Sequence, residues 1–480
     1  MIKKYIILAV FISFMFENGI AQNVVISGNA PTYAGDIFSF KYNVDLITGL
    51  EKELVQCKVS ENGDFKVSFP ISATIQASVI VGAFRGLIFL EKNTEYEIVL
   101  PPKREKTEVD KINPFFREDE FFIGVKNHTK KELNYLIADY NLRYNIYMDK
   151  NYIRILKLGY NANVENQIAI FDSIYADIKN PYFIKYKEYK HAALKNLAYV
   201  RSNEGMQTKF FGYKSVEYQN VAYMNLFNNI FSNFLSLYSK TEKGKEIPVD
   251  ILDKKSLATL KMTVKDWDIL HSDSLVELVI LKGLYDGLLA RSYPHEIVKV
   301  LLDSMIVHSK IDESKLIAKN ILNSSNFLLT DFPAPDFRLH DVNKREVTLA
   351  NLSERFIYLT FCNLKSYTCL QELEMLKIFH EKYAEYFDIV TISVDENFEE
   401  TKEYFRTHKY EWKLLSNNSY SKVLSDYQIK AYPTYYLINP DKILKLAPAP
   451  SPGDDFEQKF GVIWQAYKNE QQREEYRKND

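Results

Sequence analysis

Three successive patterns of apolar and polar residues divide this chain of 480 residues. Residues 24–100 contain short runs in which apolar and polar side chains alternate, separated by tight turns, and this predicts β-strands. From about residue 110 to residue 328, apolar side chains recur every three or four positions, which predicts helices. Beyond residue 332, strand-like and helix-like runs follow one another. The pattern therefore predicts a multidomain α+β protein.

The first region, residues 22–105, is predicted to be an antiparallel β-sandwich, because seven short strands with tight turns are typical of that architecture. Cys57 shares one face of its strand with Val55 and Val59, so we expect it to be a small buried core residue. The predicted strands are Val24–Ile26, Ile37–Tyr42, Leu54–Val59, Phe65–Phe69, Ser78–Val81, Leu87–Leu90 and Tyr96–Leu100.

The second region, residues 110–328, is predicted to be a helical domain of about eight helices. Helix starts are expected at Asn163, at Asp273 and near Pro294, where a capping residue or a first-turn proline fits. An aromatic stripe consists of Tyr182, Phe183, Tyr186 and Tyr189. It could line a ligand groove, although packing between helices is the favoured interpretation. The pattern predicts helices here and no particular chemistry.

The third region, residues 332–470, begins with Pro333 and Pro335, which hold the chain extended. After two short strands near residues 340 and 348, the pattern predicts a buried strand, a helix, a strand, a helix, a hairpin and a final helix from Asp455. Residues 471–480 form a charged tail. This order of elements predicts an α/β domain with an added N-terminal hairpin.

Met1 to Ala21 have the features of a secretory signal peptide. Lys3 and Lys4 precede an apolar core, and Gly19-Ile-Ala21 is a small-residue cleavage site. The apolar run is too short for a comfortable membrane span. We therefore expect a bacterial protein exported to the periplasm or beyond, without a membrane span after the signal is removed.

Charge and motif content narrow the classes of function. The 61 basic and 63 acidic residues give a formal net charge of −2, which provides no electrostatic case for nucleic-acid binding. The eight histidines are scattered without metal-ligand spacing, and no glycine-rich phosphate loop occurs, so neither a metal nor a cofactor is predicted. Three cysteines allow at most one disulfide.

The candidate chemistry lies where the buried strand of residues 356–361 leads into the next helix. Cys362, Ser366, Cys369 and Glu372 follow that strand. A thiol at such a turn lies near the positive end of the helix dipole, which favours a thiolate. The stretch resembles the active-site segment of thioredoxin-like proteins of the exported TlpA/ResA branch. Ala334-Pro-Asp-Phe337 is likewise typical of the TlpA and AhpC/TSA group.

The resemblance implies a thiol–disulfide oxidoreductase that acts on protein or peptide thiols, with a Cys-x-x-Cys motif at the start of the helix. In this chain Ser366 takes the place of the first cysteine, and Cys362 stands where the family has tryptophan. The pKa of a serine hydroxyl is far too high to replace an attacking thiol, so Cys369 is the residue expected to carry any redox activity. Glu372 matches a family glutamate that tunes protonation, or it simply favours the helix dipole.

Three interpretations of this degenerate motif stay open. The domain could bind protein or peptide without turnover. Cys362 and Cys369 could form a non-standard pair, provided that their Cα atoms lie within about 7 Å. Cys362, Ser366 and Cys369 also have the spacing of the peroxiredoxin motif Pro-x-x-x-Thr-x-x-Cys, which would make Cys369 a peroxidatic thiol. Against all three, each cysteine could be a plain core residue.

Tyr432 and Pro433 lie in a stretch that resembles the cis-proline loop of the same family. The resemblance implies that Pro433 faces the cysteine motif and that the backbone of Tyr432 can pair with an extended substrate peptide. A cis bond before proline costs little compared with other cis peptide bonds. We therefore assign Tyr432 and Pro433 to the expected substrate-binding surface.

Overall fold

The computed structural model describes residues 23–479 except 108–109, 111–115, 159–160, 199–207, 268–269, 291, 325–327, 329, 331 and 418–421. The predicted signal at residues 1–21 lies outside this described part. The chain divides into two compact units. We call residues up to 104 together with 119–318 the N-terminal unit, and residues 105–118 together with 319 onward the C-terminal unit.

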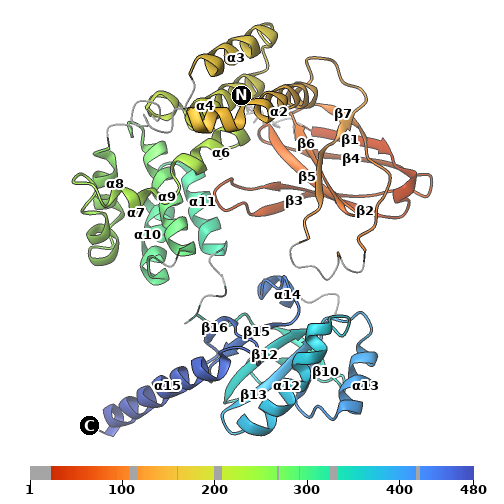
Figure 1. Ribbon diagram of the computed structural model, residues 1–480, viewed down its shortest axis with the longest axis vertical. Helices are drawn as coiled ribbons and strands as arrows, with labels where there is room; N and C mark the ends of the chain where they lie inside the picture. The colour runs from red at the N-terminus through yellow and green to blue at the C-terminus, as the bar shows by residue number, and fades with distance from the viewer. Residues whose placement is uncertain are drawn as a thin grey trace, which may run out of the picture. The chain divides into compact units, whose positions relative to one another are not determined.

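The N-terminal unit contains two β-sheets that share one apolar core (Figure 1). Val24 and Ile26 of one sheet and Phe38 and Phe40 of the other are all buried in this core. One sheet has the order β4 (Asp64–Pro70), β1 (Asn23–Asn29), β7 (Glu95–Val99), β9 (Gly124–Val125). The other has the order β3 (Glu51–Lys58), β2 (Ile37–Asn43), β5 (Ile75–Val81), β6 (Phe84–Leu90), β8 (Asp119–Phe122).

Two features of these sheets differ from the prediction. The pairs β1–β7 and β6–β8 are parallel, so the arrangement is not purely antiparallel. The short strands β8 and β9 also lie beyond the predicted boundary at residue 105, in the region expected to be helical. Both strands pair with strands distant in the sequence, and such pairing leaves no local pattern in so short a segment.

Helices fill the rest of the N-terminal unit. The longest, α2 (Leu133–Leu158), contacts β6 and β9, and its Asn134 side chain bonds both the backbone N–H and the carbonyl of Phe89. These contacts join the two regions that the sequence divided into separate domains. The others are α3 (Asn161–Ile174), α4 (Pro181–Ala198), α6 (Val221–Ile230), α7 (Phe234–Tyr238), α8 (Leu257–Lys265), α9 (Asp273–Leu289), α10 (His295–His308) and α11 (Asp312–Ser324). Short turns are η1 (Pro31–Tyr33), η2 (Thr208–Gly212) and η3 (Val249–Asp253).

Helix α9 is the buried centre of the helical region. It lies among α7, α8 and α10 (Figure 1), and residues Leu275 to Leu284 are buried on every side. Ser272 caps its N-terminus by accepting a hydrogen bond from the backbone N–H of Leu275. Most of this stretch is apolar, and its buried charges are paired, Glu277 with Lys261 and Lys282 with Asp286, which agrees with a position in the core.

The C-terminal unit is built on one seven-stranded sheet in which β12 (Phe356–Cys362) is an internal strand. Strand β12 is parallel to β13 (Phe387–Ser393) and antiparallel to β15 (Thr434–Ile438). The remaining strands are β10 (Arg338–Asp341), β11 (Glu346–Thr348), β14 (Lys413–Ser416) and β16 (Leu444–Ala449), in the order β11-β10-β14-β13-β12-β15-β16. The sequence analysis did not include β14, which has only four residues.

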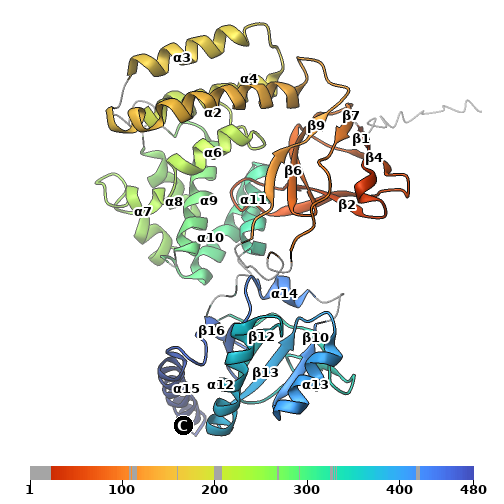
Figure 2. The ribbon, with the colours of Figure 1, turned by 45° about the vertical axis from the view of Figure 1, so that its right-hand side comes forward.

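Both faces of this sheet are covered. Helices α12 (Tyr367–Tyr383) and α13 (Phe398–His408) lie over one face (Figure 2), and their core includes residues of α15 (Phe456–Asn479). The other face packs against a separate core that includes Val423 of α14 (Val423–Asp426). This explains why all seven residues of β12 are buried. Helix α15 also continues through most of the segment predicted as a charged tail.

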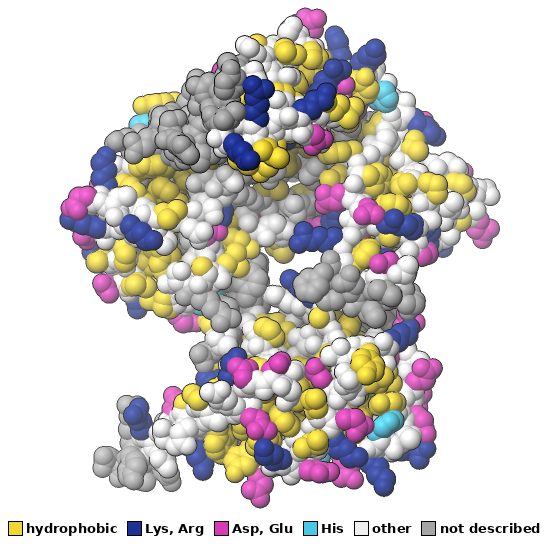
Figure 3. Space-filling model, in the orientation of Figure 1, with side chains coloured by type: hydrophobic (Ala, Val, Ile, Leu, Met, Phe, Trp, Pro, Cys, Tyr) yellow, Lys and Arg dark blue, Asp and Glu magenta, His cyan; other side chains and the backbone are white. Residues whose placement is uncertain are grey.

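The surface carries mixed charge. On the face shown in Figure 3, basic and acidic side chains are interspersed, without a large area of one sign. This agrees with the formal net charge of −2. In the described part of the chain, no helix is both long enough and apolar enough to cross a membrane.

Candidate functional site

Strand β12 carries Cys362 to the end of the sheet at which the candidate site lies. Cys362 is the last residue of the strand and pairs with Ser393 of β13. Its backbone carbonyl accepts a hydrogen bond from the N–H of Val394 at 3.0 Å. The Cys362 side chain belongs to the core under α12, together with Cys369 and Leu373. The sheet therefore fixes Cys362 directly beneath the first turns of that helix.

A four-residue turn, Asn363 to Ser366, links β12 to α12. The carboxylate of Asp395 holds this turn by accepting a hydrogen bond from the backbone N–H of Leu364 at 3.0 Å. Asp395 in turn accepts hydrogen bonds from the hydroxyls of Ser393 and Thr401. Asp395 follows β13, so the neighbouring parallel strand supplies the anchor for the turn.

Ser366 joins the helix to the proline loop. Its hydroxyl oxygen caps α12 by accepting a hydrogen bond from the backbone N–H of Cys369 at 3.4 Å. The same hydroxyl donates to the backbone carbonyl of Tyr432 at 3.2 Å. The peptide bond between Tyr432 and Pro433 is cis, as expected from the resemblance. The position of the family's attacking cysteine thus faces the proline loop.

Both cysteines of the motif are buried and free: Cys362 is 4% exposed and Cys369 is 1% exposed. The backbone N–H of Asn363 points at the Cys369 sulfur, with an N···Sγ distance of 3.4 Å. Hydrogen bonding by the Cys362 thiol is the main cause that lowers the pKa of Cys369, and the same interaction raises the pKa of Cys362. Burial counteracts the lowering of the Cys369 pKa, and it adds to the raising of the Cys362 pKa. Cys369 is therefore the thiol that ionises first.

Glu372 lies one helical turn after Cys369 and is half-buried. Its carboxylate accepts a hydrogen bond from the hydroxyl of Tyr435 at 2.6 Å. Burial raises the pKa of Glu372 more than this hydrogen bond lowers it, and the nearby charge of Asp454 raises it further. The charge of Glu372 in turn opposes ionisation of both Cys362 and Cys369. Tyr435 was not singled out from the sequence, because a side-chain partner on another element leaves no local pattern.

The proline loop presents a mixed surface beside the motif. The Tyr432 ring packs against the cores on both faces of the sheet, while Pro433 is partly exposed. Tyr367, the first residue of α12, is 73% exposed, and its hydroxyl accepts a hydrogen bond from Gln371 at 3.0 Å. We call Ser366, Tyr367, Tyr432 and Pro433 the Ser366 face. Tyr367 was not singled out from the sequence, since only the structure shows its exposure.

The structure brings the six predicted site residues to one end of β12: Cys362, Ser366, Cys369, Glu372, Tyr432 and Pro433. The third cysteine, Cys57, lies elsewhere, in the core of the N-terminal unit, as expected. Burial raises its pKa. Cys57 therefore takes no part in the arrangement around Ser366.

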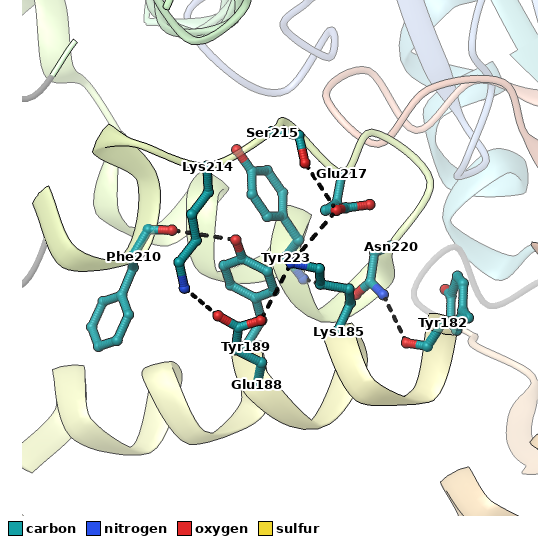
Figure 4. Close-up of polar contacts among 10 residues, drawn as sticks. All are labelled: Tyr182, Lys185, Glu188, Tyr189, Phe210, Lys214, Ser215, Glu217, Asn220 and Tyr223. Atoms are coloured by element: carbon teal, nitrogen blue, oxygen red, sulfur yellow. Dashed lines mark hydrogen bonds and ion pairs between the residues drawn. The ribbon is translucent and has the colours of Figure 1, made fainter. Parts of the chain in front are cut away.

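The aromatic stripe of α4 packs between helices, which agrees with the favoured interpretation. Phe183, Tyr186 and Tyr189 are buried. Figure 4 shows α4 joined to η2 and to the segment that follows it: the Tyr189 hydroxyl donates to the carbonyl of Phe210 in η2 at 3.3 Å, and Lys214 beyond η2 pairs with Glu188. Each cation drawn there has a carboxylate partner. This cluster therefore fastens two segments and leaves no free charge for a ligand.

Comparison with protein families gives one match. Residues 331–447 match the AhpC/TSA family. A comparison with curated proteins found no match.

Solved structures that are similar to this chain cover the same part. The thioredoxin domain of a thiol-disulfide oxidoreductase from Bacteroides vulgatus is 21% identical, covers 28% of this chain and 97% of its own, and has a TM-score of 0.26. A thiol:disulfide interchange protein from Bacteroides sp. is 20% identical, covers 26% of this chain and 81% of its own, and has a TM-score of 0.24. A thiol-disulfide oxidoreductase from Bacteroides fragilis is 19% identical, covers 23% of this chain and 86% of its own, and has a TM-score of 0.22.

The family match and the order of strands and helices lead to the same conclusion. The matched segment begins at the proline-rich start of the region and ends within β16, so it contains the whole Ser366 face. Residues 331–447 are thus similar to the AhpC/TSA family, and the thioredoxin-like resemblance drawn from the sequence is confirmed for this part of the chain.

Proposed function

We propose that this chain is an exported protein of the TlpA type whose C-terminal unit binds an extended polypeptide segment at the Ser366 face. The observation that carries this proposal is the hydrogen bond from the Ser366 hydroxyl to the Tyr432 carbonyl at 3.2 Å. It holds the motif position and the proline loop side by side, in the arrangement by which the family binds peptides. The family's recognition surface is kept although its attacking thiol is lost.

The exposed ring of Tyr367 supports the same proposal. It is 73% exposed at the first position of α12, directly beside Ser366. Exposed tyrosines are enriched where proteins bind other proteins, because they bury a large apolar ring and keep a polar hydroxyl. Tyr367 therefore offers a contact for an apolar or aromatic side chain of a bound segment.

Ordinary two-cysteine turnover does not fit these residues. Such turnover needs an accessible thiolate that attacks and a second thiol that resolves the mixed disulfide. Ser366 supplies a hydroxyl at the attacking position, and Cys369 is only 1% exposed. A protein disulfide therefore meets no nucleophilic thiol at the Ser366 face. Binding without turnover at this position is the function that the geometry favours.

Thiol–disulfide chemistry by a different pair is the second candidate, and the interaction between Cys362 and Cys369 favours it. The peroxidase interpretation is weaker. The charged groups that act on the two thiols are the carboxylates Glu372 and Asp395, which oppose thiolate formation. A peroxidatic thiol is favoured by neighbouring positive charge, whereas the one charged group among the causes that shift the pKa of Cys369 is the carboxylate of Glu372.

Binding can be tested with a fluorescently labelled polypeptide that is reduced, alkylated and unfolded, by measuring anisotropy. We expect Tyr367→Ala to weaken binding about fivefold, which corresponds to about 1 kcal/mol for an aromatic contact. Tyr213→Ala is the matched control, because Tyr213 is 79% exposed in the N-terminal unit. Equal affinity of Tyr367→Ala and the unchanged chain, or no binding by the unchanged chain, would contradict the proposal.

Export is proposed from the sequence alone. Lys3, Lys4, the apolar run and Gly19-Ile-Ala21 form the predicted signal. Determination of the N-terminus of the protein recovered from a bacterial periplasm or culture medium tests this proposal. We expect the mature chain to begin at Gln22, whereas a chain that keeps Met1 in the cytoplasm would contradict it.

A further inference from the structure

The two cysteines beneath the Ser366 face form an arrangement that the family motif does not contain. Cys362 ends β12, and Cys369 lies in the first turn of α12. The Cys369 sulfur is 3.4 Å from the backbone nitrogen of Asn363, the residue next to Cys362. Both side chains belong to one core cluster. The turn between the strand and the helix therefore brings the Cys369 sulfur back to the end of the strand that carries Cys362.

We propose that Cys362 and Cys369 are a buried redox couple that converts between a dithiol and an intramolecular disulfide by exchange with a low-molecular-weight disulfide. The inference rests on the proposed function, since the couple lies in the same site. It assigns to Cys362 a role as the resolving thiol. It also gives a reason why Cys369 can act without a thiol at position 366.

The different environments of the two thiols set the order of events. The sulfur of Cys369 receives hydrogen bonds from the backbone N–H of Asn363 and from the thiol of Cys362, and both lower its pKa. Cys362 is buried and lies near the negative charges of Asp395 and Glu372, which raise its pKa. Cys369 is therefore the attacking thiolate, and Cys362 keeps its proton until the second step.

The chemistry balances as two thiol–disulfide exchanges. The Cys369 thiolate attacks one sulfur of a small disulfide, whose S–S bond breaks as the mixed disulfide forms. The released thiolate takes a proton. Cys362 then gives up its proton, attacks the Cys369 sulfur and displaces the second small thiolate, which is protonated. The two cysteines are oxidised to one disulfide, and one small disulfide is reduced to two thiols.

Burial selects the size of the reaction partner. Cys362 is 4% exposed and Cys369 is 1% exposed, so the folded surface presents neither sulfur to a large disulfide. The turn of residues 363–366 connects Cys362 to the start of α12, and a short turn opens locally at lower cost than the whole domain unfolds. A small disulfide needs only such a local opening, whereas a protein disulfide needs far more space.

The test uses the full chain equilibrated with graded ratios of oxidised to reduced glutathione, quenched in acid, alkylated after unfolding and analysed by peptide mass spectrometry. We expect a peptide that links Cys362 to Cys369 to rise from absent in reduced glutathione to the main species in the oxidised form. Cys57→Ala should behave like the unchanged chain. Cys362→Ala should instead carry glutathione on Cys369, and Cys362→Ser provides a second, smaller change at the same position.

Absence of the Cys362–Cys369 disulfide at every ratio of oxidised to reduced glutathione would contradict the proposed redox couple. A disulfide that includes Cys57 would contradict it as well. Polypeptide binding is measured on the same reduced samples by anisotropy. If the reduced chain binds the labelled polypeptide but never forms the bridge, the couple is wrong and the proposed function stands. If the bridge forms but no polypeptide binds, the couple is supported and the proposed binding function is wrong.

Discussion

The hydroxyl of Ser366 connects the start of α12 to the proline loop. Its oxygen accepts a hydrogen bond from the N–H of Cys369 and donates one to the carbonyl of Tyr432. A neutral hydroxyl both donates and accepts, so it satisfies a helix end and a loop carbonyl together. Serine is among the preferred residues at a helix start, and the position is therefore stable without a thiol.

Glu372 gives the C-terminal unit a predictable pH dependence. Burial raises the pKa of Glu372 in the folded state above its value in the unfolded chain. The folded state then binds more protons than the unfolded state, so the contribution of Glu372 to stability is present at acid pH and is lost as pH rises through the raised pKa. We expect Glu372→Gln to reduce this loss.

Urea unfolding of both chains between pH 4 and pH 8 measures the effect. As pH rises, the free energy of unfolding of Glu372→Gln should increase relative to that of the unchanged chain, which means that the variant becomes relatively more stable. The carboxylate of Glu372 also accepts a hydrogen bond from the hydroxyl of Tyr435. Because Glu372→Gln changes this acceptor, it can lower the free energy of unfolding by a constant amount at every pH. A pH-independent difference between the two chains would contradict the assignment.

For the individual residues of the site, the sequence predicted which ones lie together but not how their side chains interact. The spacing of Cys362, Ser366 and Cys369 and the resemblance identified the right segment. The sequence could not show that Asp395 anchors the turn or that Tyr435 bonds Glu372, because both contacts connect elements through the fold. Nor could it show the burial of Cys369, which depends on how α12 packs against the sheet.

The strand–turn–helix unit of β12 and α12 is the element on which the site depends. Strand β12 lies inside the sheet between β13 and β15, and its register with these two strands fixes the position of Cys362 along the sheet. Helix α12 packs Leu373, Leu376 and Phe379 onto the same core. The turn between them is therefore held at both ends, and its geometry follows from the packing of its neighbours.

Loss of the cap should loosen the start of α12. We expect Ser366→Ala to lower the free energy of unfolding of the C-terminal unit by about 1 kcal/mol, because the N–H of Cys369 loses its side-chain acceptor. The matched control is Asn397→Ala at the start of α13, where the side chain makes no capping hydrogen bond. Chemical denaturation of both variants measures the difference, and equal losses would contradict the capping role of Ser366.

Elements with a strong pattern were predicted well, and short elements that depend on distant partners were not. The buried strand at residues 356–361 and the helix from Asp273 were both found from their apolar pattern. Strands β8, β9 and β14 have four residues or fewer, and each exists only because a neighbouring strand supplies its hydrogen bonds. Local pattern carries little information about such partners.

The whole chain consists of two compact units with separate cores. The sequence predicted more domains, because its pattern changes from strands to helices near residue 110. It could not show that Asn134 of α2 bonds the backbone of Phe89, or that Phe89 packs against Tyr182 and Tyr186. These contacts between sheet and helices unite the first two regions.

Two units with separate cores should unfold in two steps. We expect Leu359→Ala, at a fully buried position of β12, to cost the C-terminal unit about 2–5 kcal/mol and to lower one thermal transition. Leu278→Ala, at a fully buried position of α9, should lower the other. Differential scanning calorimetry separates the transitions. A single transition that both substitutions lower equally would contradict two independent units.

Ser366 is proposed to replace the attacking thiol in a site that is otherwise kept. The most direct test compares the unchanged chain with Ser366→Cys in the reduction of insulin disulfides by dithiothreitol. We predict that the unchanged chain reduces insulin no faster than dithiothreitol alone. Ser366→Cys should accelerate the reaction, because its new thiol lies at the start of α12 with Cys369 as the resolving partner. Rapid reduction by the unchanged chain, with no gain in Ser366→Cys, would contradict the account.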